Sequence, residues 1–251
     1  MHTGTSWAFL LGIALLKPAT LVLTRRESTG VELVPAGGVV LAANHISLAD
    51  PVVLCDFVLA DLHRAPRFLA KAELFRGRGL VARVMRGAGQ IPVDRGSAEA
   101  ASALQTAVQA LAAGETVVLY PEGTVTRDPR GWPMQAKTGV ARLALLSGAP
   151  VVPVAQWGAQ AVLDTGRRPV VRLRPRQPVG FRVGPPVDLS PWAGRAPTAE
   201  VLREVTDAVM DAITAELEVL RGEPAPPRWS APPRPPGADP TPGRTDERRT
   251  A

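Results

Sequence analysis

A histidine and an aspartate five residues apart could carry out acid–base chemistry. His45 and Asp50 lie in the block NHISLAD at residues 44–50. A neutral imidazole can take a proton from a hydroxyl when a carboxylate fixes its tautomer and stabilises the imidazolium that forms. The two side chains can meet if His45 lies in a loop and Asp50 starts a helix. Taken alone, the block favours a simpler interpretation, in which Asp50 caps a helix that begins with Pro51.

Two further blocks carry groups that could bind a phosphorylated substrate. The block GQIPVDR at 89–95 ends with Arg95, and a guanidinium can hold phosphate through two parallel hydrogen bonds. The block YPEGT at 120–124 places a carboxylate beside a permissive glycine. Taken alone, Arg95 is more typical of a solvated surface arginine, and the alternative for the block at 120–124 is an ordinary turn.

The elements that must position these blocks alternate between strands and helices. Strands are predicted at 38–43, 67–70, 90–93, 116–120, 151–155, 170–173 and 179–183, and helices at 50–60, 80–85, 97–114, 138–146 and 201–220. This alternation predicts an α/β fold with a mixed, largely parallel sheet flanked by helices. Ligands bind such sheets beyond the carboxyl ends of the strands. We therefore expect the polar residues after four of these strands to converge on one edge.

The blocks and their order resemble the glycerophospholipid acyltransferase family, whose best-known class is the 1-acylglycerol-3-phosphate O-acyltransferases. The resemblance covers about residues 30–160 and includes AKAELF at 70–75, KTG at 137–139 and VPV at 152–154. It implies that His45 is the catalytic base and that Asp50 orients it in a charge-relay pair. This changes the interpretation of Asp50 from a cap to a catalytic partner, although one residue could serve both purposes.

The resemblance also implies where the substrates bind. The residues expected to bind substrate are Asn44, Ser47, Lys71, Arg95, Glu122, Gly123, Thr124 and Arg127. One departure affects this set. The third block of the family usually continues GTRS, whereas Val125 stands here at the arginine position and Arg127 follows two residues later. The resemblance makes lysophosphatidic acid the expected acceptor. Because of Val125, another lysophospholipid or a glycolipid hydroxyl is an alternative.

The expected reaction moves a fatty acyl group from acyl-CoA or acyl-carrier protein to a free hydroxyl, without a cofactor. No GxSxG nucleophile elbow occurs, so direct attack by the acceptor is the simpler mechanism. A non-catalytic lipid-binding membrane protein and a lipid hydrolase or transacylase are the competing hypotheses. A relative without catalysis would be expected to lose His45 or Asp50, and both are present.

Composition limits the partners. The 251 residues carry a formal charge of +6, and Lys17, Lys71 and Lys137 are the only lysines. The charge fits an anionic partner or merely an arginine-rich composition. Aromatic residues make up only 4% of the chain, which argues against nucleic acid because stacking platforms are scarce. The three histidines do not cluster as metal ligands would, and Cys55 alone cannot form an internal disulfide, which fits a reduced compartment.

The two ends of the chain differ from the middle. The apolar run 7–23 is interrupted by Lys17 and Pro18, so residues 1–29 are predicted to form membrane-associating helices that lie in the interface. A spanning helix and a core helix are the alternatives. Residues 30–222 form the predicted acyltransferase domain, and the proline-rich segment 223–251 is predicted to be a disordered tail. The expected location is the cytoplasmic face of the cell membrane, as a peripheral or monotopic protein.

Overall fold

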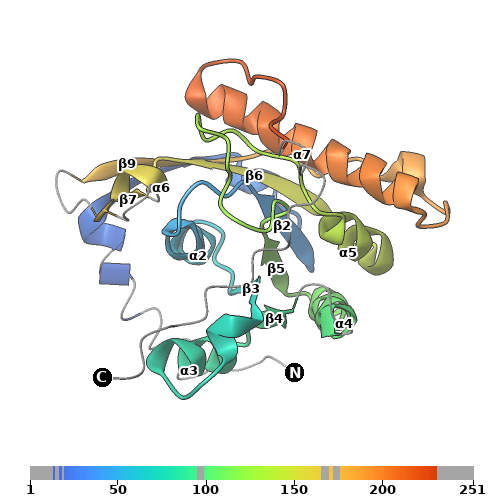
Figure 1. Cartoon of the computed structure of the whole chain (residues 1–251), viewed down its shortest axis with the longest axis horizontal. Helices are drawn as coiled ribbons and strands as arrows, with labels where there is room; N and C mark the ends of the chain where they lie inside the picture. Colours follow the sequence, from blue (N-terminus) through green and yellow to red (C-terminus); the bar gives the residue numbers. More distant parts are fainter. Residues whose placement is uncertain are drawn as a thin grey trace, which may run out of the picture.

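The chain folds into a seven-stranded sheet with helices on both faces (Figure 1). The computed structural model describes residues 14, 17–18, 20–94, 99–164, 170–171 and 176–230. The strands are β1 (Thr24–Thr29), β2 (Val39–Ala43), β3 (Pro66–Lys71), β4 (Ile91–Val93), β5 (Thr116–Leu119), β6 (Val151–Trp157), β7 (Leu163–Asp164), β8 (Val170–Val171) and β9 (Gln177–Val183). The helices are η1 (Val31–Leu33), α2 (Asp50–Ala60), η2 (Ala72–Phe75), α3 (Leu80–Gly87), α4 (Glu99–Ala112), α5 (Gly139–Ser147), α6 (Ala159–Val162), η3 (Ser190–Trp192) and α7 (Ala199–Arg221).

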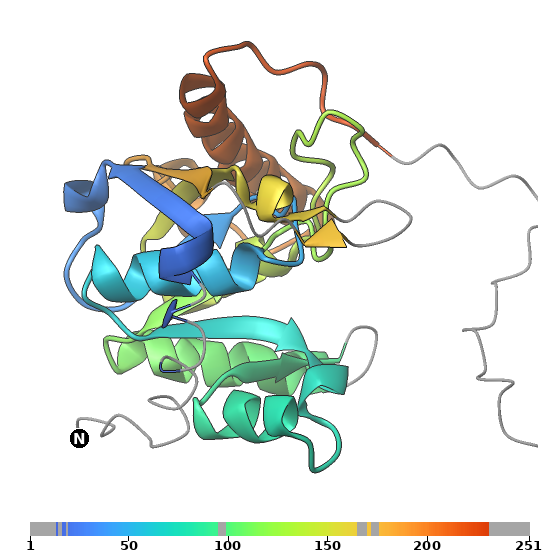
Figure 2. The same ribbon diagram turned by 90° about the vertical axis from the view of Figure 1, so that its left-hand side faces the viewer.

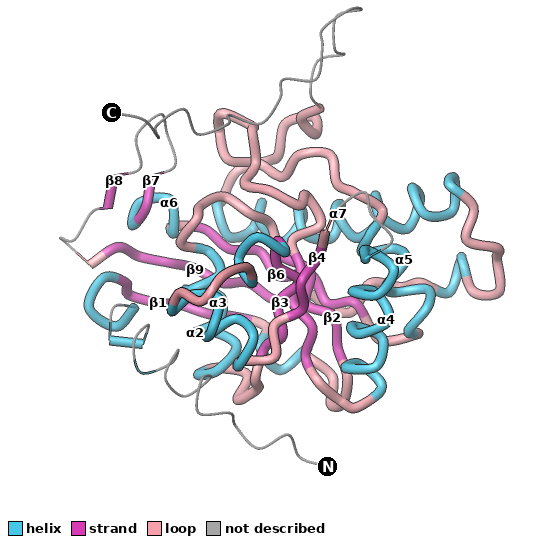
Figure 3. Tube along the Cα trace, turned by 60° about the horizontal axis from the view of Figure 1, so that its bottom comes forward, coloured by secondary structure: helices cyan, strands magenta, loops and turns pink. Residues whose placement is uncertain are grey.

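The sheet is mixed and largely parallel, as predicted. Its strand order is β1-β9-β6-β2-β5-β3-β4. Strands β6, β2, β5, β3 and β4 run parallel, whereas β9 is antiparallel to β6 and β1 is parallel to β9. The short β7–β8 hairpin lies apart from this sheet, beside α6 (Figure 3). The carboxyl ends of the five parallel strands therefore meet at one edge, where the predicted site residues follow them.

The central strand β2 explains the layers of the fold. All five of its residues are fully buried, as in a parallel strand that is covered on both faces. Because side chains alternate along a strand, Val40 and Ala42 pack with α4, α5 and α7, while Leu41 packs with α2 and β9. Figure 1 shows α7 and α2 on opposite sides of the sheet.

The sheet begins earlier in the chain than predicted. Strand β1 lies within the segment assigned to membrane-associating helices, and it pairs with β9 from Thr24 to Thr29. The segment TRREST has no apolar alternation, so its sequence gave no strand signal. Its central Arg26 instead pairs with Asp56 and, at 2.8 Å, with Asp61. The predicted domain boundary after residue 29 is therefore wrong.

Most of the predicted N-terminal helices lie outside the described residues. Of that segment, residues 20–23 are helical and lead directly into β1, with Leu21 and Val22 more than half exposed. None of the helices in the described part of the chain has the length and apolar character needed to cross a bilayer.

The start of the predicted disordered tail is ordered. Residues 223–230 turn back along α7, where Arg228 pairs with Asp207 at 3.1 Å and with Asp211. The backbone N–H of Ala225 donates to Glu218 at 2.7 Å. These contacts are made by charged side chains and backbone groups. The prediction relied on apolar periodicity, which does not detect contacts of this kind. The tail prediction is wrong for this part, and residues 231–251 lie outside the described chain.

Candidate active site

One buried carboxylate oxygen organises the loop that follows β2. Oδ2 of Asp50 accepts a hydrogen bond from Nδ1 of His45 at 2.8 Å. The same oxygen accepts from the backbone N–H groups of Ile46 at 2.6 Å and Ser47 at 2.8 Å. Asp50 is fully buried, whereas the His45 side chain is 12% exposed. With Nδ1 protonated toward the carboxylate, Nε2 is the nitrogen that can accept a proton from a substrate.

The interpretation of Asp50 as a helix cap is wrong. The N-cap of α2 is Ala49, and no side chain makes a cap hydrogen bond there. Asp50 is the first helical residue and its carboxylate turns back to the preceding loop. Burial raises the pKa of Asp50, while the hydrogen bonds and the charge of His45 act in the opposite direction. The three donors therefore offset part of the cost of burying this carboxylate.

An aromatic ring covers one face of the histidine. Tyr120 stacks on the imidazole of His45 with centroids 4.2 Å apart and planes inclined by 18°. Burial, and then the charge of Asp50, raises the pKa of Tyr120 well above its usual value, so the phenol stays neutral. The sequence analysis did not single out Tyr120 as a site residue, because an aromatic at a strand end is usually core.

Glu122 holds the backbone of His45 rather than a substrate. Its Oε1 accepts from the N–H of His45 at 2.9 Å and its Oε2 from the N–H of Met134 at 3.0 Å. The residue is only 2% exposed, and burial raises its pKa to about 7. The carbonyl of His45 accepts from Thr126 N–H at 2.7 Å. The segment after β5 therefore holds both backbone polar groups of the histidine.

Asn44 and Ser47 are also buried, contrary to the prediction that they bind substrate. The Asn44 amide donates to the carbonyl of Gln156 at 3.0 Å and accepts from its N–H at 2.8 Å, so it extends the pairing of β2 with β6. The Ser47 hydroxyl donates to the carbonyl of Leu163 at 2.8 Å and accepts from Ala49 N–H at 3.0 Å. With Glu122, these residues position the loop. A polar Gln156 inside the apolar strand β6 was the signal that could have revealed this pairing.

Glycine is required in the turn after β5. The N–H of Gly123 donates to the carbonyl of Tyr120 at 2.9 Å, and its φ of 75° lies in the left-handed region. Residues with a Cβ rarely adopt this conformation. Gly123 and Thr124 are partly exposed beside the bonds that hold His45, so they remain candidates for substrate contact.

None of the predicted cations that the structure describes makes a hydrogen bond to the His45 loop. Lys71 is exposed at the end of β3, and β5 separates β3 from β2 in the sheet. Arg127 is exposed one residue beyond Thr126, whose N–H bonds to His45. Arg95 lies outside the described residues. Arg127 therefore directly follows a residue that bonds to the backbone of His45.

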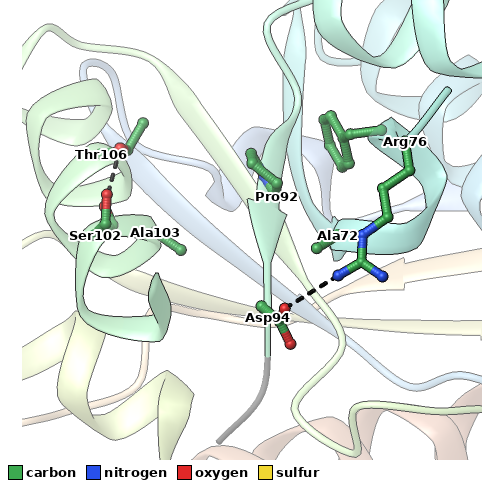
Figure 4. A pocket seen from close by; sticks show the side chains of 8 residues that line it. Ala72, Arg76, Pro92, Asp94, Ser102, Ala103 and Thr106 are labelled. Atoms are coloured by element: carbon green, nitrogen blue, oxygen red, sulfur yellow. Dashed lines mark hydrogen bonds and ion pairs between the residues drawn. The ribbon is translucent and has the colours of Figure 1, made fainter. Parts of the chain in front are cut away.

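A shallow hollow of about 400 Å³ lies at the β4 end of the sheet. Its lining comes from η2, β4 and α4, as Figure 4 shows for Arg76, Pro92 and Thr106. Arg76 crosses it to pair with Asp94 at 3.3 Å, yet its side chain is still 67% exposed. Neither member of the His45–Asp50 pair lines this hollow. We therefore assign it no part in proton transfer.

Comparisons with known proteins show which family this chain is similar to. The acyltransferase family model matches residues 25–157. A 1-acyl-sn-glycerol-3-phosphate acyltransferase of Bacillus subtilis is 28% identical over 74% of this chain and 85% of its own. One from Borreliella burgdorferi is 32% identical over 50% of this chain and 48% of its own. The crystal structure of PlsC, the 1-acyl-sn-glycerophosphate acyltransferase of Thermotoga maritima, superposes with a TM-score of 0.62 and 26% identity, covering 88% of this chain and 81% of the other.

The buried carboxyl of Glu122 should make the stability of the fold depend on pH. Because its pKa rises from 4.5 to about 7 on folding, the folded chain holds this proton more tightly than the unfolded chain. Its contribution to stability is therefore present at low pH and is lost as the pH rises through this range. Between pH 5 and 8, urea unfolding should show the wild type losing about 2–3 kcal/mol more than Glu122→Gln. Parallel pH profiles of the two proteins would contradict the assignment.

Proposed function

This chain belongs to the acyltransferase family, and from that premise we propose that it transfers a fatty acyl group from a thioester to the free hydroxyl of 1-acylglycerol-3-phosphate. The observation that carries this proposal is the buried Asp50 carboxylate bonded to Nδ1 of the partly exposed His45. The relatives from Bacillus subtilis and Borreliella burgdorferi are named for the same acceptor. Acyl transfer from a radiolabelled acyl thioester to a panel of lysolipid acceptors tests the proposal directly.

The proposed reaction is a direct acyl transfer. Nε2 of His45 takes the proton of the acceptor hydroxyl while the hydroxyl oxygen attacks the thioester carbonyl. The tetrahedral intermediate then expels the thiolate as the carbonyl re-forms, and the imidazolium gives the proton to the departing sulfur. Asp50 stabilises the imidazolium between these two steps through its bond to Nδ1. An ester forms, a thioester breaks and His45 returns to its starting state, so the reaction needs no cofactor.

The donor is proposed to be acyl-CoA or acyl-carrier protein. Both present the same thioester together with anionic groups, so exposed cations at the carboxyl edge would suit either. Among the predicted cations that the structure describes, Lys71 at the end of β3 and Arg127 after β5 are exposed and available to supply such charge. We assign Arg127 to the acceptor phosphate, because it follows the Thr126 N–H that bonds to the His45 carbonyl. Arg95 remains a second proposed phosphate ligand from the sequence resemblance.

The proposed partner surface is the membrane, at its cytoplasmic face. Exposed apolar side chains occur in the loop after β2 and at the start of α3: Leu48 is 58% exposed, Leu80 57% and Val81 61%. The stretch from the end of β3 to α3 also carries five exposed cations, Lys71, Arg76, Arg78, Arg83 and Arg86. Exposed apolar side chains together with cations suit an anionic lipid surface. Figure 2 shows the η2–α3 turn at the same end of the molecule as the arrowhead of β3.

The first prediction from the proposed function tests the catalytic base. His45→Ala should lower turnover by at least about a hundredfold, the usual scale for loss of a general base, because it removes the group proposed to take the hydroxyl proton. His63→Asn is the matched control, since His63 is exposed and Asn tolerates its left-handed backbone. Steady-state kinetics on protein with unchanged circular dichroism measures the effect. Near-normal turnover of His45→Ala would remove the proposed mechanism.

The second prediction tests the acceptor phosphate. Losing one charge-assisted contact costs about 1.5–3 kcal/mol, so Arg127→Ala should raise the apparent KM for 1-acylglycerol-3-phosphate roughly tenfold or more. The KM for the acyl donor should stay the same. Arg130→Ala serves as the control, because Arg130 is exposed in the same loop. An unchanged acceptor KM in Arg127→Ala would point to another lipid or glycolipid hydroxyl as the acceptor.

The third prediction concerns the membrane. Replacing both Leu80 and Val81 by Ser should reduce flotation with vesicles that contain phosphatidylglycerol, because two exposed apolar side chains would no longer enter the interface. Activity on detergent-dispersed substrate should persist. Leu146→Ser is the control: this side chain is 61% exposed near the end of α5, away from the carboxyl edge. Equal flotation of the variants and the wild type would rule out this surface.

A further inference from the structure

We propose that the last described residues of the chain position His45 from outside the active site. Residues 221–230, here named the C-terminal strap, lie against the β5–α5 loop, residues 120–138. This loop in turn holds the backbone of His45. The inference rests on the proposed function only in taking His45 as the catalytic base. Strap residues would act through the loop, as positioning residues.

The inner half of the connection runs from His45 to the middle of the loop. Glu122 accepts from the N–H of His45, and Thr126 N–H donates to its carbonyl at 2.7 Å. Both residues are held in turn by the next part of the loop. The Thr126 hydroxyl donates to the carbonyl of Trp132 at 2.7 Å, and Met134 N–H donates to Glu122 at 3.0 Å. Trp132 and Met134 are therefore one hydrogen bond removed from the groups that hold the histidine.

The outer half of the connection begins with Arg221. Its guanidinium lies over the rings of Trp132 and Trp157, 4.0 Å from each centroid. It also donates to the carbonyl of Arg130 at 3.0 Å, and the side chain is only 9% exposed. A desolvated guanidinium over indole rings makes one of the stronger cation–π contacts. Arg221, the last residue of α7, therefore connects this helix to the loop through Trp132 and to the end of β6 through Trp157.

The rest of the strap reaches Met134 itself. Trp229 forms an isolated parallel bridge with Met134, and its carbonyl accepts from Gln135 N–H at 3.0 Å. The strap is fastened at this point by Arg228, which pairs with Asp207 and Asp211 on α7. Figure 2 shows the chain arching from the end of α7 toward the β5–α5 loop. A continuous set of contacts thus leads from α7 through Trp229, Met134 and Glu122 to His45.

The placement of these contacts indicates positioning of the base more than stability of the core. Residues of α7 that cover the sheet, such as Val209 and Ile213, pack in a core cluster that contains no residue of the strap. A partly exposed ion pair usually contributes little to stability. Catalysis, by contrast, is sensitive to displacements of about 1 Å in the reacting groups. Loosening the strap should therefore affect turnover before it affects unfolding.

The test compares two arginines of full-length protein that pair with carboxylates of α7. Arg228→Ala should lower kcat about tenfold, while the KM values for donor and acceptor stay within about twofold. Arg228→Lys, which can keep one ion pair, should recover part of the loss. Arg195→Ala is the control, because Arg195 pairs with Glu204 at 2.8 Å near the other end of the helix, away from the loop. It should keep the wild-type kcat.

A second variant and a spectroscopic readout complete the test. Arg221→Lys keeps the charge but loses the planar stacking on the indoles, so it should also lower kcat. In both variants the NMR signal of His45 Nδ1–H should shift or broaden, whereas Arg195→Ala should leave it in place. Wild-type kcat and an unchanged His45 signal in Arg228→Ala and Arg221→Lys would overturn the strap proposal alone. Full turnover of His45→Ala would instead overturn the assignment of the base.

Discussion

The site depends on the three N–H groups that converge on Oδ2 of Asp50. The imidazole and the backbone of Ile46 and Ser47 all donate to this single oxygen, at 2.6–2.8 Å. Hydrogen bonds to a charged group are worth about 1.5–3 kcal/mol each, so the three donors together offset part of the cost of burying this carboxylate. The same atom therefore closes the loop and selects the tautomer of His45. A neutral side chain at residue 50 would weaken both functions together.

The rest of the fold can be understood as support for that one arrangement. Strand β2 delivers His45 from the centre of the sheet, where its five residues are buried by helices on both faces. Asn44 locks the end of β2 to β6 through Gln156, and Glu122 holds the His45 N–H from the loop after β5. Neighbours on both sides of β2 thus constrain the histidine. Such preorganisation avoids rearrangement during the reaction.

The sequence predicted the order of elements well because their signals are local. A run such as GVVLAA at 38–43 reads as a buried strand, and β2 begins within one residue of that start. Strand β1 and the ordered residues 223–230 were missed for the opposite reason. Their places depend on Arg26 and Arg228 finding carboxylates that are distant in the sequence. No periodicity records a pairing of that kind.

The contact between His45 and Asp50 was predictable from the sequence, whereas the contacts of the neighbouring polar residues were not. The motif identifies His45 and Asp50, yet it equally marks Asn44, Ser47 and Glu122, whose side chains are buried and bonded to backbone groups. A motif contains both residues that hold a loop in place and residues that contact a substrate, and the sequence does not distinguish the two kinds. The exposure of each side chain in the structure does. Glu122 is an example: burial raises the pKa of its carboxyl to about 7, and the same carboxyl accepts a hydrogen bond from the N–H of His45. In the proposed function, substrate recognition falls to exposed groups around the edge, so a change at Val125 or Arg127 would alter the acceptor without disturbing the His45–Asp50 contact.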